Sequence, residues 1–273
     1  MVAQAMRREG HRVVCLGVRG HADPELREHV DEFRWIGAGQ LGKAIRSFNA
    51  LGVERATMAG KFHKAEIYRP WAWLRYLPDA TFLRTFYPHF IAHSADRNDD
   101  TILGAFVEAF AKGGVEMAPA TDFAPELLVG EGRLAGPEIN GSQQADVEFG
   151  WRLAKEMGRL DVGQSVCVHR RAVLAVEAIE GTDLCLERAG QLCPKGGFTV
   201  VKVAKPQQDM RFDVPTVGVR TLETMARCGA KVLAIEADRT ILLDAEQFES
   251  RAQSLGLSIV ALSNEQPALR RAG

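Results

Sequence analysis

The side chains best suited to chemistry lie in segment 200–218, VVKVAKPQQDMRFDVPTVG. This segment begins as a hydrophobic strand and continues into charged and amide residues. Ligands of open α/β sheets bind beyond the carboxyl ends of the strands, where this polar run is expected to lie. Lysine and arginine supply positive charge and hydrogen-bond donors to phosphate oxygens. The segment therefore predicts a phosphate site among Lys202, Lys205, Gln207, Gln208, Asp209, Arg211 and Asp213.

Asp213 is the carboxylate of this segment with a candidate catalytic role. It could hold Mg²⁺ or orient a water for in-line attack on phosphorus. It lies two residues before Pro215, which is expected to begin a helix because proline suits the first helical position. The alternative is a solvated loop in which Asp213 adjoins a helix start. The residues alone weigh these two readings equally.

A second candidate segment, VLAVEAIEGTD, spans residues 173–183. Here a strand delivers Glu177, Glu180, Thr182 and Asp183 to a turn beside a glycine, so the acidic groups could collect at a metal ion. Ordinary helix capping by Thr182 or Asp183 is the alternative, and the residues alone slightly favour it. The segment 158–164, GRLDVGQ, has turn chemistry at its two glycines and is read as structural.

Several known site types have no support in this sequence. No complete phosphate-binding P-loop motif, G-x-x-x-x-G-K-[ST], is present, and no G-x-S-x-G. Basic and acidic residues number 34 and 35, which argues against a nucleic-acid partner. The five cysteines are scattered without a C-x-x-C pair, which argues against a zinc site and fits a reducing compartment.

The sequence also predicts where the protein works. No apolar stretch approaches the ~20 residues of a membrane span, and the first ten residues lack the apolar region of a signal peptide. We therefore expect a cytoplasmic protein, which would reach any lipid substrate from the membrane surface.

Hydrophobic patterns predict strands and helices throughout the chain, as in an α/β fold. In the first 60 residues their alternation is typical of a mainly parallel sheet with helices on its faces. The expected strands are 11–18, 33–38, 54–59, 115–120, 165–168, 172–178, 199–203, 232–235, 240–243 and 258–262. The expected helices are 1–9, 40–51, 99–111, 143–160, 183–192, 216–227 and 245–255. Ser142 is the expected N-cap of the fourth helix. Segment 62–98 is rich in aromatic residues and is expected to be irregular, with some helical pieces.

Segment 129–141 has four glycines, one proline and no periodicity, so it is expected to be a linker. It divides the chain into an N-terminal domain of residues 1–128 and a C-terminal catalytic α/β domain of residues 142–273. We expect the first domain to be Rossmann-like and the second to be mixed α/β.

Four stretches together resemble the LpxI family, the UDP-2,3-diacylglucosamine pyrophosphatases. They are RNDDTIL (97–103), GRLDVGQ (158–164), VLAVEAIEGTD (173–183) and KVAKPQQDMRFDVPTVG (202–218). Their order and spacing agree with the family, and the similarity covers almost the whole chain. Family members begin with a strand and a glycine-rich turn of the kind GLIAGGGxLP. This chain starts inside the helix that follows, so the first strand of the Rossmann-like domain is expected to be missing.

The resemblance implies two α/β domains with an active site between them. It implies Mg²⁺-dependent hydrolysis, with Mn²⁺ as a second suitable ion, to UMP and 2,3-diacylglucosamine 1-phosphate (lipid X) in lipid A synthesis. Asp213 matches the essential aspartate of the family, and Glu177 is the second candidate metal ligand. The implied substrate-binding residues are Lys202, Lys205, Gln207, Gln208, Arg211, Thr182 and Asp183.

The expected partners are UDP-2,3-diacylglucosamine and, transiently, the surface of the inner membrane, to which the protein would be peripheral. A homodimer stays open. Two rival functions remain: a nucleotide-sugar-binding protein without catalysis, and a different Rossmann-like nucleotide-dependent enzyme such as a nicotinamide-dependent reductase.

Overall fold

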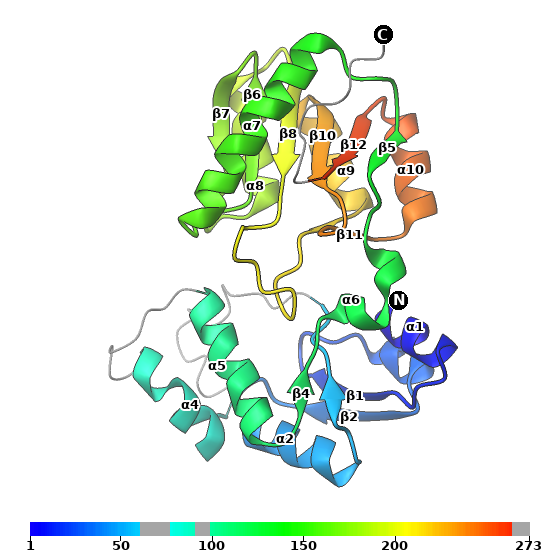
Figure 1. The fold of residues 1–273 in the computed structure, drawn as a ribbon, viewed down its shortest axis with the longest axis vertical. Coiled ribbons are helices and arrows are strands. Elements are labelled where there is room, and N and C mark those ends of the chain that lie inside the picture. The colour runs from blue at the N-terminus through cyan, green and yellow to red at the C-terminus, as the bar shows by residue number, and fades with distance from the viewer. Residues whose placement is uncertain (61–76, 91–98, 264–273) are drawn as a thin grey trace. The chain divides into compact units, whose positions relative to one another are not determined.

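The computed structural model describes residues 1–60, 77–90 and 99–263 of the chain, which divides into two compact units. Unit 1 comprises Met1–Pro125 together with Asp209–Phe212. Unit 2 comprises Glu126–Gln208 and the residues from Asp213 onward. Both units combine helices with strands (Figure 1), as the α/β prediction requires.

Unit 1 contains two short parallel strand pairs with helices packed beside them. The first pair is β1 (Val14–Val18) with β2 (Glu32–Ile36), and the second is β3 (Arg55–Ala56) with β4 (Glu116–Met117). The helices are α1 (Val2–Arg8), the 3₁₀ helix η1 (Pro24–His29), α2 (Leu41–Ala50), α4 (Ala80–Phe90), α5 (Asp99–Lys112) and α6 (Ala120–Phe123). One hydrophobic core joins α2, α4 and α5 to the strands, and it is built mainly on α2, α5 and the second strand pair.

Unit 2 is built on a six-stranded sheet in the order β5-β12-β10-β8-β6-β7. Its strands are β5 (Gly132–Ala135), β6 (Ser165–His169), β7 (Ala172–Val176), β8 (Phe198–Lys202), β10 (Ala230–Glu236) and β12 (Ser258–Leu262). The central strands β8, β10 and β12 are mutually parallel, whereas β5, β6 and β7 run antiparallel to their neighbours. The sheet of unit 2 is therefore mixed, in the domain expected to be mixed α/β, whereas the strand pairs of unit 1 are parallel as the alternation in the first 60 residues predicted.

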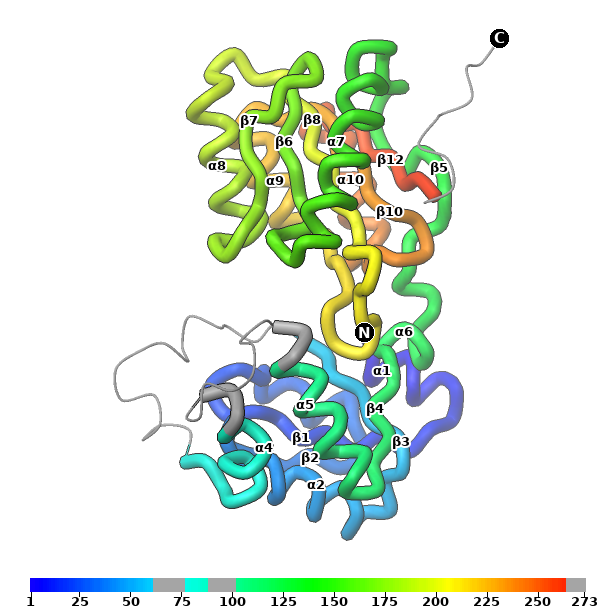
Figure 2. The backbone as a smooth tube through the Cα atoms, turned by 60° about the vertical axis from the view of Figure 1, so that its left-hand side comes forward, coloured from blue at the N-terminus to red at the C-terminus, as the bar shows by residue number. Residues whose placement is uncertain are grey.

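Helices cover both faces of this sheet (Figures 1 and 2). One face carries α7 (Gly141–Arg159), whose Val147, Trp151, Ala154 and Met157 pack on the sheet. The other face carries α8 (Thr182–Leu192), α9 (Val219–Cys228) and α10 (Ala245–Ser254). Because both faces are covered, β8 and β12 are buried along their whole length, including the polar Thr199, Lys202 and Ser258.

Three local predictions were wrong. The helix expected from residue 216 begins at Val219, because Thr216 and Val217 form strand β9, which pairs with β11 (Ile241–Leu242). Pro215 therefore precedes a strand. Asn140, not Ser142, caps α7, since its side chain accepts hydrogen bonds from the backbone of residues 142 and 143 while Gln143 reaches back to it.

One segment differs in detail from expectation, and in a second a helix lies where helical pieces were expected. The range 129–141 was expected to be a linker. It contains β5, an edge strand that pairs on one side only, with β12. Within the aromatic segment, α4 forms a regular helix whose Phe82 and Phe86 rings lie 4.6 Å apart between centroids. Trp71, Trp73 and Tyr76 of that segment lie outside the described residues.

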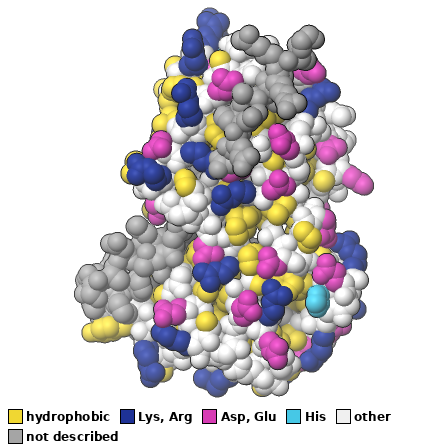
Figure 3. Space-filling model, viewed as in Figure 1, with side chains coloured by type: hydrophobic (Ala, Val, Ile, Leu, Met, Phe, Trp, Pro, Cys, Tyr) yellow, Lys and Arg dark blue, Asp and Glu magenta, His cyan; other side chains and the backbone are white. Residues whose placement is uncertain are grey.

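Basic and acidic side chains are interspersed over the face drawn in Figure 3, which accords with the near balance of charges in the sequence. Among the described residues, no helix combines the length and apolar character needed to cross a bilayer.

Candidate functional site

The carboxyl end of strand β8 brings together three of the predicted site residues. Lys202, its last residue, is 7% exposed and donates a hydrogen bond to Thr182 Oγ1 at 2.9 Å. The Thr182 hydroxyl in turn donates to Glu177 Oε1 at 2.8 Å. Thr182 is the first residue of α8, and Glu177 directly follows β7. The turn between β7 and α8 thus sets a hydroxyl and a carboxylate beside the lysine.

This cluster has unused capacity to bind a ligand. Among the described residues, no carboxylate lies within ion-pair distance of the Lys202 ammonium, although burial removes most of its water. Glu177 Oε2 is buried and has no hydrogen-bond partner there. The N-cap of α8 is Gly181, which has no side chain to satisfy the first N–H groups of the helix. A buried cation beside free backbone donors is an arrangement suited to an anion.

Lys205 lies at the centre of a second cluster. Its Nζ is 2.5 Å from Asp161 Oδ1 and 3.6 Å from Asp213 Oδ2. The lysine is buried, whereas the Asp213 side chain is 34% exposed. Asp161 follows α7 in the left-handed backbone region, with φ of 56°, which aspartate tolerates better than most residues. The structure thus joins Asp213 to a lysine, with one carboxylate face open.

The two glutamines of the segment support the loop itself. Gln208 Oε1 accepts a hydrogen bond from the Lys205 backbone N–H at 2.8 Å, and Gln207 Nε2 donates to the Arg159 carbonyl at 3.2 Å. Gln208 Nε2 is buried without a partner among the described residues, so both of its N–H donors are unused there. A Cβ on Gly158 would lie 3.1 Å from Lys205 Cα, so the loop passes close against the end of α7.

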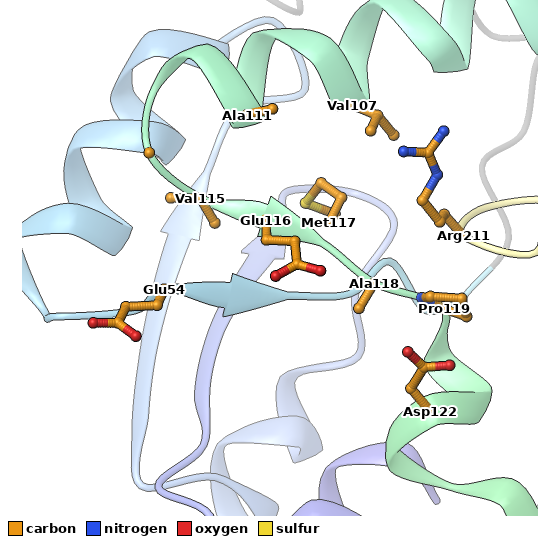
Figure 4. Close-up of a pocket in the computed structure, with 11 residues that line it drawn as sticks. Glu54, Val107, Ala111, Val115, Glu116, Met117, Ala118, Pro119, Asp122 and Arg211 are labelled. Carbon is orange, nitrogen blue, oxygen red and sulfur yellow. The ribbon is translucent and has the colours of Figure 1, made fainter.

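Arg211 and Asp183 have other surroundings. Arg211 belongs to unit 1, where its guanidinium and backbone N–H donate to the Asp209 carboxylate. These bonds lower the pKa of Asp209 and raise that of Arg211. Arg211 also lines a pocket of about 560 Å³ in unit 1 (Figure 4). Asp183 forms an ion pair with Arg220 at 3.4 Å, on the surface of unit 2.

The carboxylates of the site fit a particular kind of metal binding. In the part of the chain that the structure describes, no three His, Cys, Asp or Glu side chains gather into a metal site. Mg²⁺, however, is often held by one or two carboxylates together with substrate phosphates. Asp213, whose side chain is 34% exposed, fits such a shared site, and Glu177 offers one oxygen that has no partner among the described residues.

A third cluster, of Lys155 and Glu236, was missed by the sequence analysis. Glu236, the last residue of β10, is fully buried, and both its carboxylate oxygens lie 2.7 Å from Lys155 Nζ. Burial lowers the pKa of Lys155, and bonding to Glu236 opposes that shift. An acidic residue ending the apolar run of β10 was the available signal for Glu236. Asp161 was also missed, because GRLDVGQ was read as turn chemistry alone.

The family comparison covers nearly the whole chain. Residues 1–127 match the LpxI N-terminal domain, and residues 130–260 match the LpxI C-terminal domain. The UDP-2,3-diacylglucosamine pyrophosphatase LpxI of Caulobacter vibrioides is 30% identical over 264 residues, which span 94% of this chain and 91% of the relative. The matched ranges include all three clusters described above. The chain belongs to the LpxI family.

Proposed function

We propose that this protein hydrolyses the pyrophosphate bond of UDP-2,3-diacylglucosamine, releasing UMP and 2,3-diacylglucosamine 1-phosphate in lipid A biosynthesis. It is a hydrolase of the pyrophosphatase class, as is the Caulobacter relative by its name. The observation that carries the proposal is the contact between Asp213 and Lys205. Asp213 is partly exposed and Lys205 is buried, and both belong to segment 202–218, which resembles the family. A carboxylate next to a lysine is chemistry suited to attack of water on phosphorus.

Asp213 and Lys205 take complementary parts in this reaction. Asp213 orients the attacking water or accepts its proton, and Lys205 offsets negative charge that develops on the phosphoryl oxygens. Asp161 holds the Lys205 ammonium from its other side at 2.5 Å. We further propose that Asp213, with Glu177 as a second oxygen donor, holds Mg²⁺ or Mn²⁺. When bound, such an ion would add positive charge at the phosphoryl oxygens.

The Lys202 cluster provides a place for a phosphate group of the substrate. Its ammonium has no carboxylate partner among the described residues, and the first N–H groups of α8 lie at the same turn. Thr182 adds a hydroxyl. Four further residues remain proposals for substrate binding: Gln207, Gln208, Arg211 and Asp183.

The acyl chains call for apolar surface near these polar groups. Leu160 and Val162, in the turn before β6, are exposed, and Ile179, in the turn before α8, is 96% exposed. We propose that these residues make transient contact with the inner membrane or with the acyl chains. Whether the protein is also a homodimer is decided by its mass in solution.

The test is release of UMP from UDP-2,3-diacylglucosamine by the purified full-length chain. We expect hydrolysis with Mg²⁺, its loss in EDTA and its return with added Mg²⁺. The variant Asp213→Asn should lower kcat by roughly 100-fold or more while the unfolding midpoint holds. The control is Glu187→Gln on α8, which removes the same charge from a half-exposed carboxylate paired with Arg227 and should retain parent activity.

Each alternative gives a different result. Substrate binding without UMP release would indicate a nucleotide-sugar-binding protein. Quenching of protein fluorescence by NADPH would indicate a nicotinamide-dependent enzyme. Full activity of Asp213→Asn would remove that residue from the mechanism, and full activity in metal-free buffer would remove the ion.

A further inference from the structure

One buried ion pair, Lys155 with Glu236, is hydrogen-bonded to both backbone polar groups of Ala204. The Ala204 N–H donates to Glu236 Oε2 at 2.7 Å, and the Ala204 carbonyl accepts from Lys155 Nζ at 3.0 Å. The same Nζ lies 2.7 Å from both Glu236 oxygens. Ala204 itself is fully buried. Two charged side chains from α7 and β10 thus fix a single residue at the end of β8.

The position of Ala204 in the chain connects these hydrogen bonds to the candidate site. Ala204 directly precedes Lys205, the lysine that lies between Asp161 and Asp213. The Lys205 backbone is bonded in turn to Gln208, through its N–H at 2.8 Å and its carbonyl at 3.0 Å. A shift of Ala204 would therefore carry the Lys205 side chain with it.

Stability alone does not account for such a pair. Removing two charges from water costs several kcal/mol per ion, and well-packed apolar residues of similar size are often as stabilising or more so. What the ion pair supplies, and apolar residues cannot, is an acceptor for the N–H and a donor for the carbonyl of the same residue, Ala204. Geometry is thus the property that this pair contributes.

We propose that Lys155 and Glu236 are positioning residues, which act through Ala204 to hold the Lys205 ammonium at Asp213. The proposal rests on the proposed function for its catalytic consequence. Neither residue touches the reacting atoms in this scheme. Their contribution is the placement of Lys205, and a displacement of about 1 Å at a catalytic group can cost roughly 100-fold in rate.

The test compares two double variants, because either single substitution would leave a buried charge unpaired and could prevent folding. Lys155→Met with Glu236→Leu removes both charges and the acceptor for the Ala204 N–H. Lys155→Met with Glu236→Gln removes the charges but keeps an oxygen acceptor. We expect kcat to fall at least about 10-fold in the first pair and to recover partly in the second.

A matched control is available on the same helix. Asp146 of α7 is also buried, and its carboxylate accepts from the backbone N–H groups of Arg170 and Arg171 at the β6–β7 turn. Asp146→Asn weakens similar hydrogen bonds from a buried carboxylate to the backbone, in a segment remote in sequence from Lys205. It should lower the unfolding midpoint and leave kcat within about 2-fold of the parent.

The decisive measurement repeats the Lys155→Met, Glu236→Leu change in a Lys205→Met background. If the pair acts through Lys205, its removal there should change kcat by less than about 2-fold, because coupled residues are not additive. The proposal would be overturned if the kcat losses from the Lys155→Met, Glu236→Leu change and from Lys205→Met multiplied in full. Equal kcat in the two double variants would overturn it as well.

Failure of the proposed function gives a separate result. If the parent chain releases no UMP, the function fails, and the positioning role is then measured by hydrogen exchange. The Ala204 and Lys205 amides should exchange faster in the Lys155→Met, Glu236→Leu variant, while the β6–β7 amides keep their protection. Unchanged exchange at Ala204 and Lys205 would overturn the positioning role.

Discussion

At the scale of single residues, Lys205 is the group whose surroundings decide most about the site. Its ammonium lies 2.5 Å from Asp161 and 3.6 Å from Asp213. Asp161→Asn keeps the size and the left-handed backbone but removes one charge that holds the lysine. We expect stability to fall by about 1–3 kcal/mol and turnover by roughly 10-fold, since Lys205 loses its closest carboxylate.

Urea unfolding and steady-state kinetics of the same variant check this expectation. The control is Glu223→Gln, which breaks a half-exposed pair with Arg251 at 3.0 Å and should cost at most about 1 kcal/mol. Parent turnover in Asp161→Asn would show that Lys205 does not depend on Asp161 for its position.

The Asp209–Arg211 pair predicts how the stability of the protein changes as the pH falls. Hydrogen bonds from the Arg211 guanidinium hold the pKa of Asp209 below its usual range. A carboxyl whose folded pKa is lowered contributes stability above its unfolded pKa, about 4, and loses it as pH falls through the folded value. The unfolding midpoints of the parent and Asp209→Asn should therefore differ at pH 7 and converge as the pH falls below about 4.

Urea titrations between pH 2 and pH 7 measure this convergence. Arg211→Met should show the same pH dependence, because it removes the partner instead of the carboxyl group. A difference between parent and Asp209→Asn that stays constant with pH would assign the effect to packing rather than to charge.

At the scale of elements, two loops of unit 2 meet at Gly163. A Cβ at this position would lie 2.0 Å from the Glu177 carbonyl oxygen, so the turn before β6 accepts only glycine without a shift of the backbone after β7. Gly163→Ala should cost about 1–3 kcal/mol and lower turnover, because Glu177 must move.

The matched substitution is Gly104→Ala in α5, where a Cβ meets open space. It should raise stability by about 0.5–1 kcal/mol, since alanine favours a helix interior over glycine. Thermal unfolding of both variants makes the comparison. Equal effects of the two substitutions would contradict the close contact at Gly163.

At the scale of the whole molecule, each unit has its own core. Phe110 lies in the core of unit 1 and Phe248 in a core of unit 2. Truncating either to alanine should cost about 3–5 kcal/mol, but the loss should concentrate in the unit that contains it. Phe110→Ala should raise hydrogen exchange in segment 209–212 as well, because Phe212 packs against the same core.

Hydrogen exchange of the two full-length variants, measured by mass spectrometry, shows whether each loss of stability stays within one unit. We expect Phe248→Ala to leave the α5 peptides protected and Phe110→Ala to leave the β8 and β10 peptides protected. Exchange that rises equally in both units with either variant would mean that the chain unfolds as one cooperative body.

The periodicity of the sequence determined most of the long elements. The helices expected at 99–111 and 143–160 and the strands expected at 199–203 and 258–262 correspond to α5, α7, β8 and β12. These patterns are local records of burial, so they can be read without knowing which element packs against which. The four family motifs likewise determined the family, because their residue types and spacing survive in the linear sequence.

Tertiary structure alone decided strand β9 and the charge pairs. β9 has two residues and forms by pairing with β11, which lies within the strand predicted at 240–243. Lys155 and Glu236 are 81 residues apart, and only the packing of α7 beside the end of β10 brings them together. Asp161 and Lys205, 44 residues apart, are joined in the same way. An ion pair depends on distance in space, which a sequence pattern does not encode.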